Sequence, residues 1–349
     1  MVETRDVRAH LLRKMFVFMV VPMINVDGVY HGHFRMDGFG KNLNRYYVDP
    51  CPEKQPAVYG IKELAKHLVR DNRLSFYFDL HAHNARKGHF IYGNAINDFV
   101  EQVESQVFCK LFATNNPGFE YAYCNFSQKQ MNSRDRFEER TKEGCGRVVM
   151  HRLAGVIHSY SLECGIIAAT RPNAVPGAPN REFGIGEKGL VEEERTEPGM
   201  FDEEAYRRLG KSMLVSVLDV FDKNPYNRIY NATPYKSMEM LRRITAFEVF
   251  HKDERFRMFE KYVYGKVKNI NELIRDVLNS KLHYRELYNF YFYNDGELKS
   301  LEWPENIPGL VKPKPQRLKR FRSLQEPKTD YSLSFINDLR IHRDQLQQQ

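Results

Sequence analysis

Apolar runs of strand length alternate with stretches of helical spacing along the first 225 residues of the chain. A continuous apolar run, typical of a buried strand, occupies 16–23. We expect a second buried strand at 74–80, a strand at 157–163 and a short one at 89–92. Apolar residues spaced three and four apart predict helices over 5–15, 56–71, 97–113, 148–155 and 202–223. Strands that alternate with helices predict an α/β fold, with a mixed, mostly parallel twisted sheet and helices on both faces.

The pattern changes after residue 226. Helical spacing continues over 236–262 and 268–278, and a stretch rich in lysine, arginine, proline and glutamine follows. We therefore expect a helical extension at 227–310 and a basic, disordered tail at 311–349.

Composition and charge narrow the class of protein. Hydrophobic residues make up 42% of the chain and aromatic residues 13%, which allows a large core and excludes a chain that is disordered throughout. The five cysteines are scattered without metal-binding spacing, and the N-terminus has no hydrophobic signal core, so we expect reduced thiols and a cytoplasmic protein. The net charge of +8 indicates acidic partners, which could be nucleic acid, a membrane surface or an acidic protein tail.

Three separated segments carry candidate chemistry. Arg35 and the pair Asn44-Arg45 follow the first apolar run, and an arginine's planar fork binds a carboxylate through two parallel hydrogen bonds. His81 follows the strand expected at 74–80, and Glu163 ends the strand expected at 157–163, so we expect both at strand ends. A histidine there can bind a metal, and a buried glutamate can act as a general base. Singly, each also fits an ordinary role: a turn pair, a histidine bonded to backbone, or a solvated carboxylate.

Taken together, the segments resemble the cytosolic carboxypeptidases, a subfamily of the zinc carboxypeptidases that trims glutamate from tubulin tails. The matching motifs keep one order along roughly residues 5 to 230. They are VPMINVDG (21–28), Arg35, LNR (43–45), DLHAH (79–83), GCGR (144–147) and YSLE (160–163).

The resemblance implies a role for each matching residue. His81 becomes a ligand of one zinc ion, and Arg35 becomes the electrophilic group that faces the scissile carbonyl. Asn44 and Arg45 become the binding site for the terminal carboxylate of the substrate.

Two further residues complete the implied site. Glu163 becomes the base that activates the attacking water and then protonates the leaving amine. Arg147 is the candidate partner for the side-chain carboxylate of a leaving glutamate, with Lys142 as the other basic group to consider.

The resemblance also implies what is missing. The family binds zinc through a His-x-x-Glu pair upstream of the apolar run at 16–23, and His10, followed by Arg13, is no substitute. We therefore expect residues 1–226 to be a partial metallocarboxypeptidase domain from a truncated sequence, which by itself binds zinc poorly.

Two other functions stay open at this point. One is a catalytically dead homologue that binds acidic protein tails such as glutamylated tubulin, and the other is nucleic-acid binding through the basic run at 312–322. We expect an acidic tail as the partner, no membrane and no specific nucleic acid, and a location in the cytoplasm on microtubules or cilia.

Overall fold

A three-stranded sheet lies at the centre of the residues that the computed structural model describes, which are 5–135, 140–179, 188–190, 199–253 and 255. These residues all belong to one compact unit, Met1–Leu298. The strands are β1 (Phe76–Lys87), β2 (Phe90–Tyr92) and β3 (His158–Ile167), in the order β1-β3-β2. The long pairing between β1 and β3 is parallel and the short pairing between β2 and β3 is antiparallel, so the sheet is mixed, as predicted.

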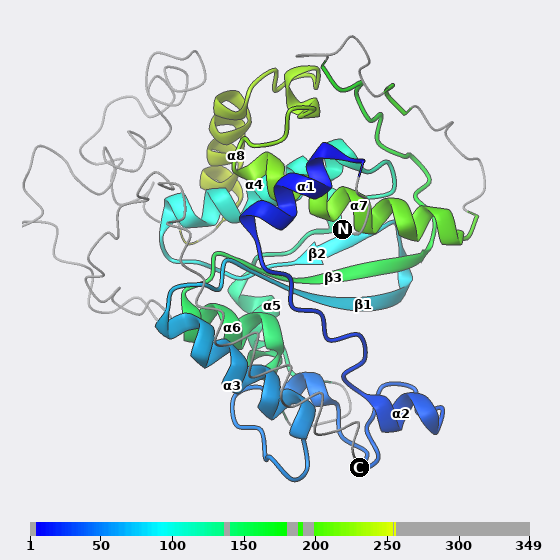
Figure 1. Cartoon of the computed structure of the whole chain (residues 1–349), viewed down its shortest axis with the longest axis vertical. Coiled ribbons are helices and arrows are strands. Elements are labelled where there is room, and N and C mark those ends of the chain that lie inside the picture. The colour runs from blue at the N-terminus through cyan, green and yellow to red at the C-terminus, as the bar shows by residue number, and fades with distance from the viewer. Residues whose placement is uncertain (1–4, 136–139, 180–187, 191–198, 254, 256–349) are drawn as a thin grey trace, which may run out of the picture. The chain divides into compact units, whose positions relative to one another are not determined.

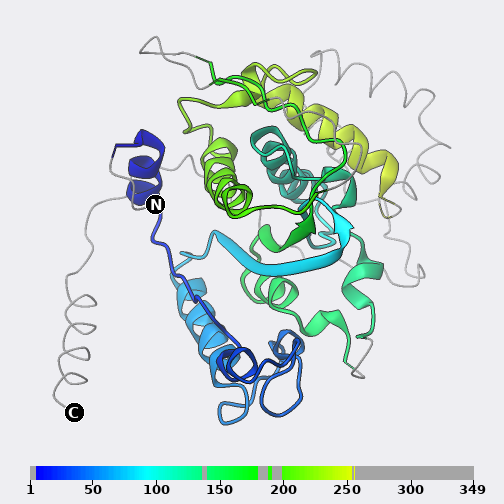
Figure 2. The ribbon, with the colours of Figure 1, turned by 90° about the vertical axis from the view of Figure 1, so that its right-hand side faces the viewer.

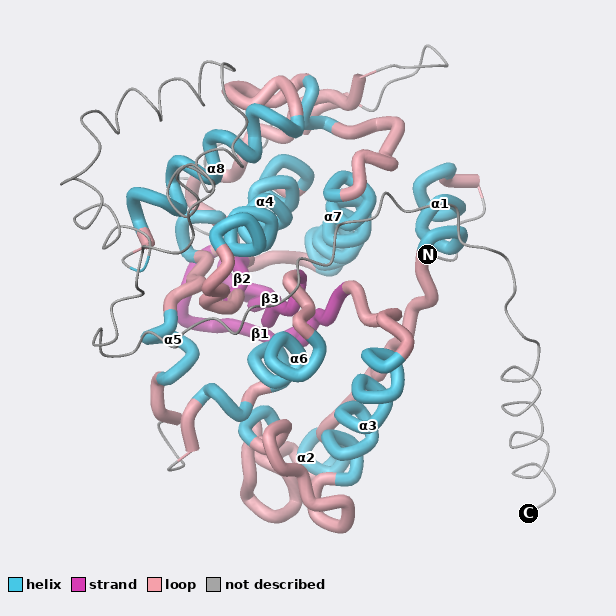
Figure 3. The backbone as a smooth tube through the Cα atoms, turned by 90° about the vertical axis from the view of Figure 1, so that its left-hand side faces the viewer, coloured by secondary structure: helices cyan, strands magenta, loops and turns pink. Residues whose placement is uncertain are grey.

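Helices cover both faces of this sheet (Figures 1 and 3). One face carries α1 (Val7–Met15), α4 (Phe99–Asn115) and α7 (Glu203–Val220), with α8 (Met238–Lys252) packed on α4. The other face carries α3 (Pro56–Arg70), α5 (Gln128–Asn132) and α6 (Gly146–Ala154), and the short α2 (Val26–Tyr30) lies beyond them. The predicted α/β fold is therefore confirmed for the described residues.

Local sequence signals explain where the long helices begin and end. Pro56 occupies the first turn of α3, where its missing N–H costs nothing. The Asp202 carboxylate accepts a hydrogen bond from the Ala205 N–H at 2.8 Å and caps α7, and Asp98 caps α4 in the same way. At the end of α6, Gly155 has a φ of 62°, the left-handed conformation that glycine adopts without strain.

Two apolar clusters fix these helices to the sheet. Between the sheet and α4 and α7, Phe108 stacks on Tyr160, and both are fully buried. Between α3 and α6, a second cluster is built around Tyr47 and Met150. Both faces of the sheet are packed. The packing therefore fixes the positions of the sheet side chains on the α6 side, and also the position of the loop after α2.

The prediction of a buried strand at 16–23 is wrong. This segment is extended but pairs with no described strand, and Val17 and Val20 are 80% and 77% exposed. Figure 2 draws the segment as a coil that leaves α1. Of its residues, Phe16 and Phe18 pack inward, and the Phe16 ring lies 6.1 Å from that of Phe76, the first residue of β1. An apolar run shows that a strand is possible, but its ladder needs a partner strand, which no described residue provides.

The predicted domain division stays a prediction. A helix does lie within the range predicted at 236–262, because α8 occupies Met238–Lys252 and packs on α4 through Leu241 and Val249. The rest of the predicted extension after residue 255, and the predicted tail at 311–349, lie outside the described residues.

Candidate active site

His81 and Glu163 are direct neighbours across the parallel pairing of β1 with β3. Paired residues of parallel strands project from the same face, so both side chains lie on the side of the sheet that α6 covers. The prediction that they stand at strand ends is wrong, because β1 continues to Lys87 and β3 to Ile167. The strands extend further than their apolar runs because the β1–β3 ladder continues through polar and small residues.

The side chains of His81, Asp79 and Asn44 form one hydrogen-bonded group around the His81 ring. Its Nε2 atom lies 2.9 Å from Asp79 Oδ2 and 2.9 Å from Asn44 Nδ2. The Asn44 amide also donates to Asp79 Oδ2 at 2.8 Å, and its Oδ1 accepts from the Gly146 N–H at 2.8 Å. Asn44 therefore joins β1 to the first turn of α6 and is itself fully engaged.

The electrostatics of this pair of strands favour proton chemistry. Burial acts to lower the pKa of His81, but the charge and hydrogen bond of Asp79 and the charge of Glu163 outweigh it, so the pKa is raised. Burial raises the pKa of Glu163, and the nearby positive charges of His81, Lys142 and Arg147 reduce this effect without cancelling it. A glutamate with a raised pKa is suited to accept and return a proton near neutral pH.

Two glycines allow the segment around Arg147 to approach Arg45 and Tyr77 closely. A Cβ at Gly144 would lie 2.3 Å from the Arg45 carbonyl oxygen, and one at Gly146 would lie 2.3 Å from the Tyr77 hydroxyl. Both distances are too short for real atoms, so the GCGR sequence packs here only because these positions lack side chains. The Tyr47 N–H also donates to the Gly144 carbonyl at 3.1 Å, which holds the two segments together.

Arg35 and the pair Asn44-Arg45 are the predicted carboxylate-binding residues, which we call the clamp. Both arginines of the clamp contact a carboxylate of the chain itself. Arg45 donates to Asp135 Oδ2 through Nε at 2.9 Å and Nη2 at 2.7 Å, and Arg35 Nη2 lies 3.1 Å from the same oxygen. Asn42, rather than Asn44, adds the amide donor, at 3.3 Å. Sequence reasoning missed Asp135, whose only signal is one acidic residue in the otherwise basic stretch NSRDR.

Arg147 is buried without an acidic partner. Its side chain is among the largest fully buried ones, and the residue is 2% exposed. Its Nη1 donates to the Gly93 carbonyl at 2.5 Å and to Asn94 Oδ1 at 3.0 Å, while no carboxylate among the described residues lies within ion-pair distance. The described hydrogen-bond partners of Arg147 are neutral oxygens, so its buried charge is not neutralised by an ion pair and can bind an anion.

Lys142 adds a second cation near Arg147. Burial lowers the pKa of Lys142, and repulsion from Arg45 and Arg147 lowers it further. Its Nζ donates to Gln130 Oε1 at 3.3 Å and forms no ion pair with any carboxylate in the described part of the chain. Lys142 and Arg147 therefore both bring positive charge close to Glu163.

These residues do not by themselves complete a zinc site. A protein zinc site uses three or four nitrogen, sulfur or carboxylate ligands. Among the described residues, no group of three histidine, cysteine or acidic side chains is arranged to hold a metal ion. The Nε2 atom of His81 is already engaged with Asp79 and Asn44.

Comparison with known proteins identifies the relatives of this chain. No family model matches it. It is 28% identical over 309 residues to cytosolic carboxypeptidase-like protein 5 of Ailuropoda melanoleuca, covering 64% of this chain and 34% of that protein. It is also 29% identical over 220 residues to human cytosolic carboxypeptidase 6, covering 62% of this chain and 38% of that protein. The chain is similar in sequence to several cytosolic carboxypeptidases.

The chain spans about a third of the length of the curated relatives it matches. Among solved structures, the metallo-carboxypeptidase of Pseudomonas aeruginosa is 17% identical and covers 63% of this chain and 50% of its own, with a TM-score of 0.44. A likeness at that level carries no weight for function.

All five cysteines are free, and no described helix is long and apolar enough to cross a membrane.

Proposed function

We propose that this chain is part of a zinc metallocarboxypeptidase that removes glutamate from polyglutamylated or branched protein tails, such as those of tubulin. The observation that carries the proposal is the buried cation Arg147, which lies near Glu163 and Lys142 and has no ion-pair partner among the described residues. A leaving glutamate brings two carboxylates, so its site needs two separate sets of cations. Homology to the cytosolic carboxypeptidases supports the same reaction class.

In this proposal each charged residue has one task. Arg147 binds the side-chain carboxylate of the terminal glutamate. Arg45 binds its α-carboxylate, next to Asn44, and Arg35 faces the scissile carbonyl, where negative charge develops. Because Arg35 and Arg45 contact Asp135, the substrate carboxylate must share or displace that partner.

Glu163 acts as the general base. Its carboxylate accepts a proton from the attacking water and then gives that proton to the amine of the leaving glutamate. The pKa of Glu163, raised by burial, suits it to both halves of this exchange.

We propose one Zn²⁺ as the cofactor of the whole enzyme. One Zn²⁺ would polarise the scissile carbonyl and acidify the attacking water. His81 is the described residue that would contribute a ligand, and the other ligands, by family resemblance a His-x-x-Glu pair, would have to come from outside the described residues.

A second candidate function is a binding module for acidic tails without catalysis. It is supported by the cations Arg147 and Lys142, which form no ion pair with a carboxylate among the described residues, since carboxylate binding by them needs no metal. In either case we propose acidic tails such as glutamylated tubulin as partners and the cytoplasm, on microtubules or cilia, as the location.

Metal analysis and a release assay separate the two candidates. We expect the chain as it stands to keep less than one zinc per molecule after dialysis. We expect a version extended by an upstream His-x-x-Glu segment to hold one zinc and release glutamate from polyglutamylated or branched tubulin peptides. An extended, zinc-loaded protein that releases no glutamate from any such peptide would rule out the enzyme and leave the binding module.

A further inference from the structure

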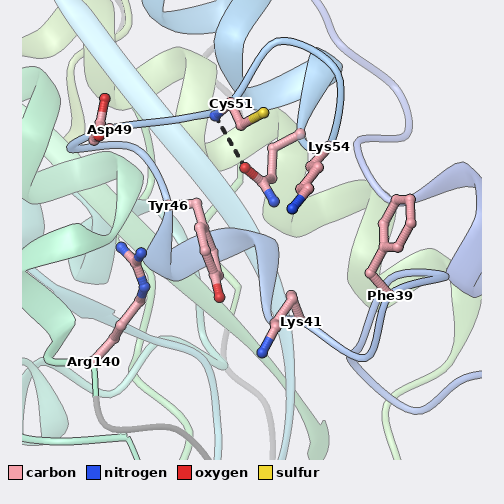
Figure 4. A pocket seen from close by; sticks show the side chains of 8 residues that line it. Phe39, Lys41, Tyr46, Asp49, Cys51, Lys54 and Arg140 are labelled. Carbon is pink, nitrogen blue, oxygen red and sulfur yellow. Dashed lines mark hydrogen bonds between the residues drawn. The ribbon is translucent and has the colours of Figure 1, made fainter.

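A basic pocket lies directly beside the clamp residues. It has a volume of about 310 Å³, at the lower end of the roughly 300–1,000 Å³ typical of ligand sites. Figure 4 shows its lining side chains, which are those of Phe39, Lys41, Tyr46, Asp49, Cys51, Lys54, Gln55 and Arg140. We call the group formed by Lys41, Tyr46, Lys54 and Arg140 the basic pocket.

The cations of the basic pocket have no acidic partner in the described part of the chain. Lys41, Lys54 and Arg140 form no ion pair with a carboxylate of those residues. The one acidic residue of the lining, Asp49, points away from Tyr46 and Lys54 in Figure 4. Single exposed lysines are usually solvated and mean little, but three cations around one hollow attract an anion together.

One of these cations is held in place. The Arg140 guanidinium lies over the Tyr46 ring, 4.1 Å from its centroid, which is a cation–π contact. Tyr46 is half-buried, so its ring gives Arg140 a fixed support. A guanidinium oriented in advance loses less conformational entropy when it binds a carboxylate.

Two pairs of adjacent residues and one backbone hydrogen bond connect the basic pocket to the clamp and its neighbours. Tyr46 follows Arg45, and Lys41 precedes Asn42. The Arg140 carbonyl accepts a hydrogen bond from the Asp135 N–H at 2.9 Å. A peptide whose end lies at Arg45 would therefore meet the basic pocket with residues that precede its end.

We propose that the basic pocket binds a carboxylate side chain of an oligoglutamate tail, at a position before the terminal glutamate. The proposal rests on the function proposed above, since that function places the terminal glutamate at Arg45 and Arg147. The ligand is an acidic peptide: the pocket adds affinity for the second or later glutamate, and it favours long acidic tails over single residues.

The test compares a short and a long ligand of the same chemistry. N-acetyl-glutamate and N-acetyl-tetraglutamate are titrated into the chain by calorimetry, and wild type should bind the tetrapeptide more tightly. The double variant Lys41→Gln/Lys54→Gln should weaken tetraglutamate binding about three- to tenfold, as expected for two exposed charge contacts. It should leave N-acetyl-glutamate binding unchanged within twofold. Arg140→Gln should act in the same direction.

A matched control removes the same charge elsewhere. Lys14→Gln/Lys223→Gln changes two exposed lysines of α1 and the turn after α7, and it should leave both ligands unaffected. If this control weakens tetraglutamate as much as the pocket variant does, the effect is general charge and the pocket is not a site. The same conclusion follows if wild type binds both ligands equally, or if the pocket variant weakens both by one factor.

The outcome also separates this proposal from the proposed function. Arg147→Gln, with Arg147→Lys as a milder variant should the first misfold, should weaken N-acetyl-glutamate binding. If neither Arg147 variant does so while the pocket variant still weakens tetraglutamate, the proposed function fails and the acidic-peptide site stands. If both Arg147 variants weaken N-acetyl-glutamate while the pocket variant changes nothing, only the pocket proposal fails.

Discussion

Arg45 and Asp135 form a buried ion pair, with Arg45 Nη2 2.7 Å from Asp135 Oδ2 and with side chains that are 8% and 2% exposed. Arg35 contacts the same oxygen, so one carboxylate neutralises two arginines. This arrangement makes Asp135 an internal counterpart of the carboxylate that the clamp is proposed to bind.

Asp135→Asn should strongly destabilise the chain. The change leaves Arg45 buried without its counter-charge, which typically costs about 3–5 kcal/mol. Urea unfolding measures the loss, and Asp71→Asn is the matched control, since its pair with Arg73 is exposed and should contribute less than about 1 kcal/mol. Equal losses for the two variants would show that Asp135 does not hold the arginines.

The same variant should be rescued by an added carboxylate. If Arg45 can bind a free carboxylate, millimolar N-acetyl-glutamate should restore part of the lost stability of Asp135→Asn, because a ligand that binds only the folded state stabilises it. Wild type, with Asp135 in place, should gain less. The melting temperature with and without ligand is the measurement, and equal gains for the two proteins would contradict binding at this position.

Arg45 and Arg147 should differ in what they recognise. Arg45→Ala should weaken glutamate and neutral C-terminal residues alike, because every chain end has an α-carboxylate. Arg147→Ala should cost mainly the preference for glutamate; an unpaired carboxylate in a desolvated site costs about 2–5 kcal/mol, so the preference should fall more than tenfold. Affinities for N-acetyl-glutamate and N-acetyl-norvaline give the ratio, and an equal loss for both ligands would point to Lys142 instead.

Glu163→Gln should separate binding from turnover in the zinc-loaded, extended enzyme. Glutamine keeps the shape of the side chain but cannot take a proton, so turnover should fall by about 10²–10⁴-fold while the affinity for glutamate peptides changes little. Glu203→Gln, at the exposed start of α7, is the control and should leave turnover intact. Near-normal turnover in Glu163→Gln would assign this residue a structural role.

Asp219 should make the free energy of unfolding of the chain depend on pH between pH 6 and pH 4. Burial raises its pKa from 3.8 to about 6, although Asn115 and Asn224 donate hydrogen bonds to it. The folded state therefore binds this proton more tightly than the unfolded state, so the contribution of Asp219 to stability increases as the pH falls from 6 to 4. The increase is about 3 kcal/mol at most, at 1.4 kcal/mol per pH unit.

The measurement is the difference in free energy of unfolding between wild type and Asp219→Asn. It should shift in favour of wild type between pH 6 and pH 4 and stay constant above pH 7. A difference that is the same at every pH would show that Asp219 stays ionised in the folded state throughout this range.

The sequence by itself determined the helices, because their signals are local. The proline at position 56 and the cap at Asp202 mark where α3 and α7 begin, and apolar spacing marks the faces that pack. The motifs with His81 and Glu163 also placed two candidate residues on strands that the structure pairs side by side.

Only the tertiary structure decided which groups meet. The apolar run at 16–23 fits a strand, but a strand forms only with a partner, and local sequence does not say whether one is present. Arg45 and Asp135 are 90 positions apart, and their ion pair exists because η1 (Leu43–Arg45) and the segment before residue 136 are brought to the same side of the sheet. Spacing along a chain fixes contacts over a few residues, whereas contacts across such separations depend on how the packed layers fold back on one another.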